Sequence, residues 1–186
     1  MKKLYKEEIV KIPEGCSIEI NNKIITIKGP KCTLIRDLSH ITVTFALEDN
    51  NLICKLWNGT KKQQSKIITC ASIIRNAIKG CMTGFRYVLT AVYKHFPIGI
   101  EIVDNGKTVI VKNFVGEKAI RKYQMIGESY ARLGDEKDTL VIEGPSIEDV
   151  SQSAGNIQNK CRVLRYDDRL FLDGIYVSQR GIIEGH

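Results

Sequence analysis

The chain lacks the features by which membrane-spanning and secreted proteins are recognised. No apolar run approaches the roughly 18 residues that are needed to cross a bilayer. The opening residues, from Met1 through Lys6 to Glu8, are charged where a signal peptide would have an apolar core. We therefore expect a soluble protein of the cytoplasm that has no membrane partner.

Zinc-binding spacings are also absent, although the chain has 6 cysteines. No two of them form a C-x-x-C pair, and none stands near a pair of histidines. Cys54 and Cys70 have apolar neighbours, as expected of core positions. We predict reduced, mostly buried thiols that behave as small apolar side chains, with no metal and no other cofactor.

Catalytic signatures are missing as well. The sequence contains no G-x-G-x-x-G, P-loop, H-E-x-x-H or G-x-S-x-G motif, so nothing indicates a small-molecule substrate. His40 stands among predicted strand residues, where a hydrogen-bonded structural histidine is the simpler interpretation. His95 has no carboxylate or cysteine near it in sequence with which to form a triad. The chain is therefore predicted not to be an enzyme.

Positive charge, in contrast, is in excess. The 28 Lys and Arg residues outnumber the 21 Asp and Glu residues, which gives a net charge of +7 and favours a polyanionic partner, nucleic acid before anionic membrane. Residues 1–82 hold half of the basic residues but one third of the acidic ones, so the excess arises there. In the second half an acidic block at 135–149 precedes a basic one between Lys160 and Arg169. Local potential governs phosphate binding, so the second half also remains a candidate for RNA binding.

Two stretches of the sequence recur in the same order. Pro13 and the segment 23–28 recur as Pro97 and the segment 107–112, each 84 residues later. Each segment follows a tight-turn pair, Asn21-Asn22 or Asn105-Gly106, that is typical of hairpins. A helical face recurs 83 residues later, with Ile67, Ala71, Ile74 and Ile78 matched by Val150, Ala154, Ile157 and Cys161. We interpret the chain as a tandem duplication, with a first repeat at 1–82 and a second at 83–186.

Each repeat is predicted to be a small antiparallel sheet packed on one helix, which makes the fold class α+β. The first repeat has strand patterns at 18–20, 24–28, 41–45 and 52–57 and a helix at about 63–79. The second has strand patterns at 85–93, 100–103, 109–111 and 139–143. Its helix opens at Pro145-Ser146, with Asp149 completing an S-x-x-D capping box.

Only the second repeat has a C-terminal extension. It passes through several arginines into Phe171–Val177, which is aromatic and contains glycine. Such a stretch suits contact with an RNA backbone and packing on bases or sugars. The alternative is a C-terminal strand that completes the second sheet.

Several motifs resemble the universal large-subunit ribosomal protein six family, called nine in eukaryotes. In the first repeat these are Lys28-Gly29-Pro30-Lys31, Thr33-Leu34 and Arg36-Asp37. In the second they are Gly84-Phe85-Arg86-Tyr87, Val92-Tyr93-Lys94-His95-Phe96-Pro97, Asn113-Phe114-Val115-Gly116-Glu117-Lys118 and Phe171-Leu172-Asp173-Gly174-Ile175-Tyr176-Val177, which resemble the archaeal and eukaryotic branch. The resemblance covers essentially the whole chain. Cys32 departs from it, because the family usually has glycine there.

The resemblance implies a two-domain protein that binds large-subunit ribosomal RNA near the sarcin-ricin loop and the stalk base, among neighbouring ribosomal proteins. Its motifs imply that Arg86, Lys94, His95, Lys118, Gly174 and Tyr176 contact the RNA, with Gly174 allowing close backbone approach and Tyr176 offering a stacking or sugar contact. The basic C-terminal stretch adds Lys160, Arg162, Arg165, Arg169 and Arg180. The competing hypothesis is a protein-interaction module that docks a basic partner through the acidic 135–149 face.

Overall fold

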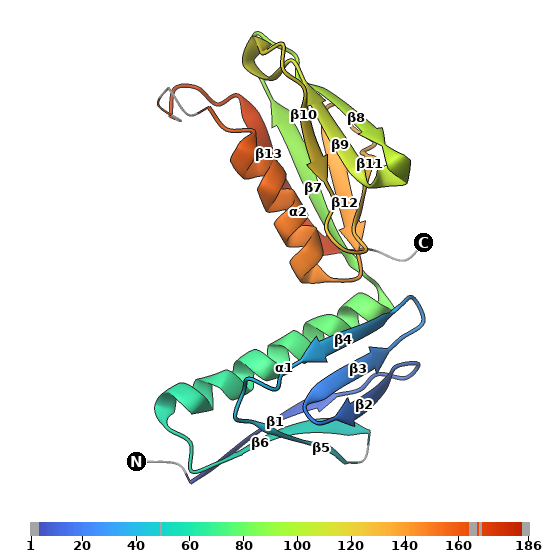
Figure 1. Cartoon of the computed structure of the whole chain (residues 1–186), viewed down its shortest axis with the longest axis vertical. Helices are drawn as coiled ribbons and strands as arrows, with labels where there is room; N and C mark the ends of the chain where they lie inside the picture. The colour runs from blue at the N-terminus through green and yellow to red at the C-terminus, as the bar shows by residue number, and fades with distance from the viewer. Residues whose placement is uncertain (1–3, 49, 164–166, 168, 184–186) are drawn as a thin grey trace. The chain divides into compact units, whose positions relative to one another are not determined.

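The structure is a computed structural model, and it describes residues 4–48, 50–163, 167 and 169–183. The chain divides into two compact units, Met1–Thr83 and Gly84–His186, each with its own apolar core. Both units combine antiparallel sheets with one long helix (Figure 1), so the predicted α+β class is confirmed. Among the described residues, no helix is both long and apolar enough to span a membrane.

The first unit contains six strands and a helix. Strands β1 (Tyr5–Lys11), β6 (Asn51–Trp57) and β5 (Thr44–Glu48) form one sheet in that order. Strands β2 (Ser17–Asn21), β3 (Ile24–Lys28) and β4 (Thr33–Asp37) form the other. Helix α1 (Lys61–Met82) follows β6.

A capping box fixes the start of α1. The Thr60 side chain accepts a hydrogen bond from the Gln63 backbone N–H, and the Thr60 N–H donates to the Gln63 side chain at 2.9 Å. The helix ends where Gly84 takes a φ of +85°, a conformation that favours glycine.

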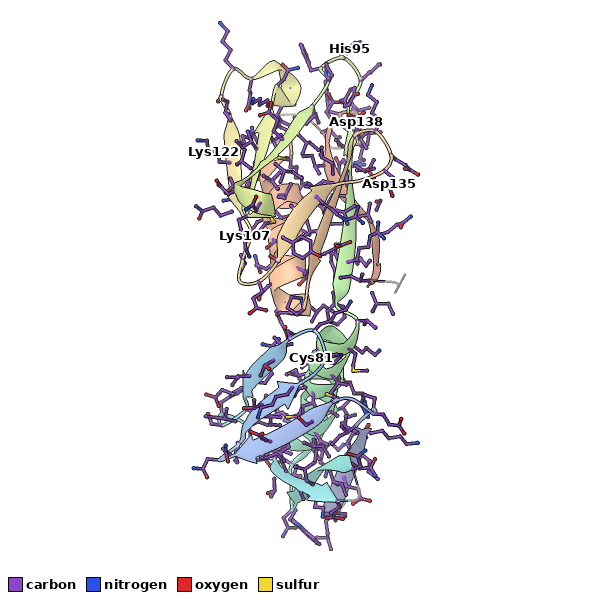
Figure 2. The ribbon with its side chains drawn as sticks, turned by 90° about the vertical axis from the view of Figure 1, so that its right-hand side faces the viewer. Cys81, His95, Lys107, Lys122, Asp135 and Asp138 are labelled. Carbon is purple, nitrogen blue, oxygen red and sulfur yellow. The ribbon has the colours of Figure 1, made fainter. Side chains whose placement is uncertain are left out.

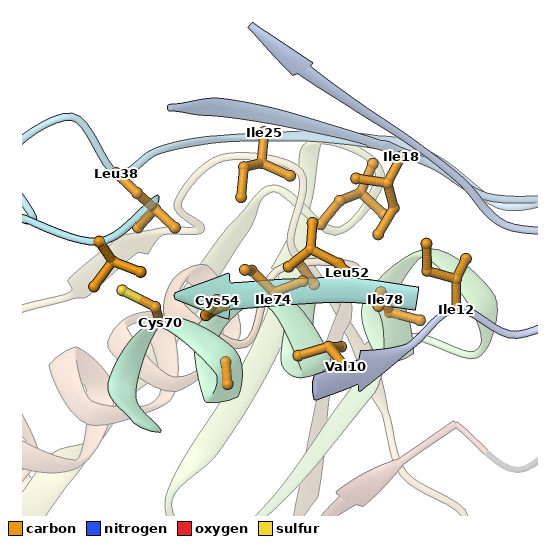
Figure 3. Close-up of a cluster of buried hydrophobic side chains, with 14 of the residues drawn as sticks. Val10, Ile12, Ile18, Ile25, Leu38, Leu52, Cys54, Cys70, Ile74 and Ile78 are labelled. Atoms are coloured by element: carbon orange, nitrogen blue, oxygen red, sulfur yellow. The ribbon is translucent and has the colours of Figure 1, made fainter. Parts of the chain in front are cut away.

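The core of the first unit lies between α1 and the two sheets (Figure 3). Ile74 of the helix, Ile25 of β3 and Leu52 of β6 are completely buried. Burying a side chain of this size contributes roughly 1.5–3 kcal/mol. This packing holds the short sheets together, since small sheets need an apolar face packed against another element to be stable.

The second unit repeats this order of elements. Strands β11 (Tyr130–Leu133), β12 (Thr139–Gly144), β7 (Phe85–Val92) and β13 (Gly174–Ile182) form a four-stranded sheet in that order. Strands β10 (Arg121–Gln124), β9 (Thr108–Lys112) and β8 (Gly99–Val103) form the second sheet. Helix α2 (Ile147–Lys160) packs on the four-stranded sheet and runs beside β13 (Figure 1).

The units differ at one sheet edge. In the first, β1 is an edge strand, whereas its counterpart β7 pairs along its whole length with β13. The helix faces singled out by sequence periodicity are buried in both units, with Ile67, Ala71, Val150 and Ala154 fully so. The C-terminal extension therefore supplies the strand that distinguishes the second unit.

The sequence patterns located both helices, but α1 is longer than predicted at each end. The strand predicted at 41–45 is present but begins three residues later, because β5 spans Thr44–Glu48. Ile41 and Val43 are buried although they lie in a loop, so their alternation imitates a strand. His40 is an exposed turn residue, not a strand histidine.

The hairpin between β2 and β3 also departs from the prediction by one residue. Its two turn residues are Asn22 and Lys23, with φ of 46° and 68°, where the sequence indicated Asn21 and Asn22. Four further strands were not predicted, namely β1, β4, β10 and β11.

Candidate RNA interface

An exposed cationic loop follows β7. Lys94, His95, Phe96 and Pro97 are all exposed, and Figure 2 shows His95 at one end of the second unit. The loop is anchored at its base, where the Tyr93 hydroxyl donates to the Asp138 carboxylate at 2.9 Å. Its tip is thus held in place without using its charged side chains.

A second loop, residues 113–120, packs against the first. The Asn113 side-chain amide donates to the Pro97 carbonyl at 2.9 Å. Gly116 has a φ of +75°, and a Cβ built there would lie 3.1 Å from the Phe96 ring. Glycine therefore allows the ring to approach the loop. Lys118 is exposed on this loop, so the fold brings together the regions of Lys94, His95 and Lys118.

Arg121 connects the second loop to the end of α2. Its guanidinium lies 4.4 Å from the centre of the Phe114 ring, pairs with Glu117 at 2.7 Å and donates to the Lys160 carbonyl. Partial burial acts to lower the pKa of Arg121, but the hydrogen bond and charge of Glu117 outweigh it and raise that pKa. Arg121 was missed by sequence reasoning, although its place just after the Lys118 motif was a signal.

Lys160 is the last residue of α2, with its ammonium 5.9 Å from the centre of the Tyr123 ring. Arg162 follows and is exposed. Residues 94–97, 113–121 and 160–162 are thus linked by successive contacts, and we call this surface the cationic end. A cation at the carboxyl end of a helix also interacts favourably with the helix dipole.

Arg169 and Arg180 are the other described arginines of the C-terminal stretch. Arg169 is 91% exposed in its side chain and approaches Asp167 at 3.6 Å. Arg165 lies outside the described residues. Arg180 is on β13, and its guanidinium lies 6.0 Å from the centre of the Tyr87 ring.

The segment around Gly174 is a strand that completes the four-stranded sheet. This was the alternative to RNA contact that the sequence offered for the C-terminal extension. Gly174 pairs with Val92, and Ile175 is fully buried. A Cβ at Gly174 would lie 3.0 Å from the Tyr176 ring, so the close approach that this glycine permits is within the protein. Tyr176 retains 38% exposure, which leaves its ring available for a contact.

Arg86 belongs to a charged cluster on the four-stranded sheet. Glu143, 6% exposed, faces Arg86 across the strands, with its Oε1 atom 3.5 Å from the arginine Nε. The same carboxylate accepts hydrogen bonds from Arg132 at 3.2 Å and from the Tyr130 hydroxyl at 3.0 Å. Arg86 also lines a hollow of about 300 Å³ with Gln179 and Arg180. The carboxylate neutralises part of this positive charge.

The acidic block does not form one surface. Glu143 is buried among arginines, whereas Asp149 lies in the first turn of α2, where its backbone N–H donates to the Ser146 side chain. Asp135 and Asp138 lie in the turn between β11 and β12 (Figure 2). Acidic groups in separate environments offer a basic partner no continuous face, so this arrangement does not favour the protein-docking hypothesis.

Comparisons of the sequence with known proteins point to one family. The profile of the family described as Ribosomal protein L6 matches residues 12–84. Large ribosomal subunit protein uL6A of Schizosaccharomyces pombe is 41% identical over 97% of this chain and 96% of its own length. The chain belongs to the ribosomal protein L6 family. Large ribosomal subunit protein uL6 of the archaeon Desulfurococcus amylolyticus is 37% identical over 94% of each chain.

A more distant L6 relative, large ribosomal subunit protein uL6 of Methanosarcina mazei, is 33% identical over 92% of this chain and 95% of its own length. Membership of the L6 family confirms the resemblance recognised from the sequence motifs. It also agrees with the prediction that the chain is not an enzyme, since these relatives are ribosomal proteins.

Proposed function

We propose that the chain is a structural constituent of the large ribosomal subunit that acts in the cytoplasm. In this proposal it binds ribosomal RNA near the sarcin-ricin loop and the stalk base, with neighbouring ribosomal proteins as further partners. Relatives that carry the name of this large-subunit protein span nearly the whole chain, which supports the proposal. The two units would be the two domains of a duplicated scaffold.

The observation that carries the RNA proposal is the cationic end. Three segments that are far apart in sequence meet there and expose Lys94, Lys118 and Arg162. RNA carries a phosphate at each nucleotide, so cations spread over a fixed surface bind its backbone by shape as well as by charge. The half-exposed Phe96 ring between the two loops offers a flat apolar surface for a base or sugar.

The test is binding of the full chain to a ribosomal RNA fragment that contains the sarcin-ricin loop and stalk base, measured over a range of salt concentrations. Each phosphate contact contributes about 0.7 to 0.9 to the slope of log affinity against log salt. Lys94→Ala with Lys118→Ala should weaken binding and reduce this slope. Lys61→Ala with Lys62→Ala, which removes two exposed lysines at the start of α1, is the matched control.

Two outcomes would contradict the proposal. Equal affinity for an unrelated RNA fragment would mean that binding is electrostatic and unspecific. A salt-independent affinity would mean that contacts between the cationic end and RNA phosphates do not drive binding. In cells, fractionation should recover the protein with the large subunit, and a predominantly ribosome-free pool would refute the assignment.

A further inference from the structure

Two thiols meet in the first unit where a strand turn contacts the end of α1. Cys32 lies in the turn between β3 and β4, and Cys81 is the second-last residue of α1. Their Sγ atoms are 3.5 Å apart although the residues are 49 positions apart in sequence. The Cys32 thiol donates to the Cys81 sulfur, whose own proton points to the Ile27 carbonyl at 3.6 Å.

Backbone contacts hold the two cysteines together. The Lys31 N–H donates to the Cys81 carbonyl at 3.1 Å, and the Lys31 ammonium donates to the Thr83 carbonyl at 2.6 Å. A Cβ built at Gly29 would lie only 2.6 Å from the Cys81 Cβ, so the turn already approaches the helix as closely as it can. The thiols therefore face one another in a fixed arrangement.

We infer that Cys32 and Cys81 are a site of reversible oxidation, at which a peroxide converts the thiol pair into a disulfide that fastens the β3–β4 turn to the end of α1. A disulfide needs a sulfur separation of about 2.05 Å, so the two sulfurs must approach by about 1.5 Å from the observed 3.5 Å.

The two sulfurs have different parts in this reaction. Cys32 is half-buried and open to a small oxidant, whereas Cys81 is fully buried. Burial and the neighbouring Cys32 raise the pKa of the Cys81 thiol to about 12, so Cys32 supplies the attacking thiolate. This sulfur attacks one oxygen of hydrogen peroxide, the O–O bond breaks, and Cys32 becomes a sulfenic acid while one water leaves.

Cys81 then closes the bond. Its sulfur attacks the Cys32 sulfenic sulfur and displaces hydroxide, which leaves as a second water with the Cys81 proton. In total, two thiols lose two electrons and two protons, and one peroxide is reduced to two waters. A thiol reductant such as dithiothreitol reverses the product by disulfide exchange.

The other thiols provide internal controls. Cys16 is half-buried in the same unit, and burial and the nearby Cys32 raise the pKa of its thiol, so it is the competing partner for Cys32. Cys54, Cys70 and Cys161 are buried and should react with an alkylating agent only after unfolding. Trypsin places Cys16, Cys32 and Cys81 in separate peptides, residues 12–23, 32–36 and 80–86, so each pairing has its own mass.

The experiment treats the full chain with hydrogen peroxide, blocks free thiols, digests without reductant and identifies linked peptides by mass spectrometry. The expected product joins residues 32–36 to 80–86, weighs about 2 Da less than the two reduced peptides and disappears with dithiothreitol. Cys32→Ser and Cys81→Ser should each abolish it, whereas Cys16→Ser should retain it. Thermal melts of each variant establish that it is folded.

The oxidised chain should also melt at a higher temperature in its first unit, by roughly 10 °C, because the bond closes a long loop in the unfolded chain. Three results would overturn the inference. These are a Cys16–Cys32 product in place of the expected one, a disulfide between two chains, or stable oxidation of Cys32 to sulfinic acid with Cys81 still reduced.

Discussion

Replacing Glu143 by glutamine tests how much the charged cluster of the four-stranded sheet stabilises the second unit. Glu143 is 6% exposed and accepts hydrogen bonds from Arg132 and Tyr130, with Arg86 at 3.5 Å. Glutamine keeps the shape and one acceptor but removes the charge. The hydrogen bonds that remain are then between a neutral acceptor and charged or phenolic donors.

The expected loss follows from three contributions. Glutamine weakens the Arg132 hydrogen bond by about 1–1.5 kcal/mol, because a hydrogen bond to a charged group contributes about 1.5–3 kcal/mol and a neutral one about 0.5–1.5 kcal/mol. It also removes the ion pair with Arg86, whose Nε atom makes no hydrogen bond, at a further cost of up to about 1 kcal/mol. The arginine side chains are 34% and 40% exposed, so solvent screening reduces this loss. Burying a neutral amide also costs less than burying a carboxylate. We expect a net loss of about 1–2 kcal/mol, and about 3 kcal/mol for Glu143→Ala, which leaves the donors unsatisfied.

Urea unfolding followed by circular dichroism measures both values, with Glu101→Gln as the matched control. Glu101 pairs with Lys112 at 2.6 Å, but both side chains are exposed, so its removal should cost less than about 0.5 kcal/mol. If Glu143→Gln costs no more than the control, or stabilises the protein, the penalty for burying the carboxylate outweighs its hydrogen bonds.

Three further predictions concern stability. Ile74→Ala and Ile157→Ala each remove a fully buried side chain, one from each unit, and each should lower the free energy of unfolding by about 2–5 kcal/mol. In calorimetry each variant should shift a different unfolding transition. A single shared transition would refute the prediction that the two units unfold independently. Thr60→Ala removes the cap of α1 and should lower the free energy of unfolding by about 1 kcal/mol, measured by thermal melts. Ser65→Ala, at an exposed position of the same helix, is the control and should cost less. Burial raises the pKa of the Cys54 thiol from 9.0 to about 12, so its contribution to stability is full below pH 9 and is lost as pH rises toward 12. Cys54→Ala should therefore flatten the alkaline decline of the unfolding free energy, and an unchanged decline would contradict this reasoning.

Much of the scaffold was predictable because its signals are local. The apolar residues on the helix faces that include Ile74 and Ile157 recur with helical periodicity over several turns. A segment with this periodicity can bury its apolar side chains together only as a helix. Short edge strands such as β4 and β10 were missed because they are held by pairing with β3 and β9, and their own sequences alternate weakly. The start of β5 was placed too early, at Ile41, for the opposite reason, since tertiary packing buries a loop there.

The candidate interface was predictable residue by residue but not as a surface. The motifs around His95 and Lys118 were visible in the sequence, and so was the basic stretch after Lys160. Their meeting depends on Gly116 accommodating the Phe96 ring and on Arg121 reaching the end of α2, which are contacts between distant segments.

The family, the duplicated α+β plan and the excess of positive charge could be read from the sequence, because they depend on composition, periodicity and motifs within short windows. The tertiary structure, in contrast, sets which charges act together. It placed Glu143 against Arg86, used Gly174 for the protein's own packing and set Cys32 beside Cys81. Each of these outcomes depends on strand register and helix packing, which join residues far apart in the chain.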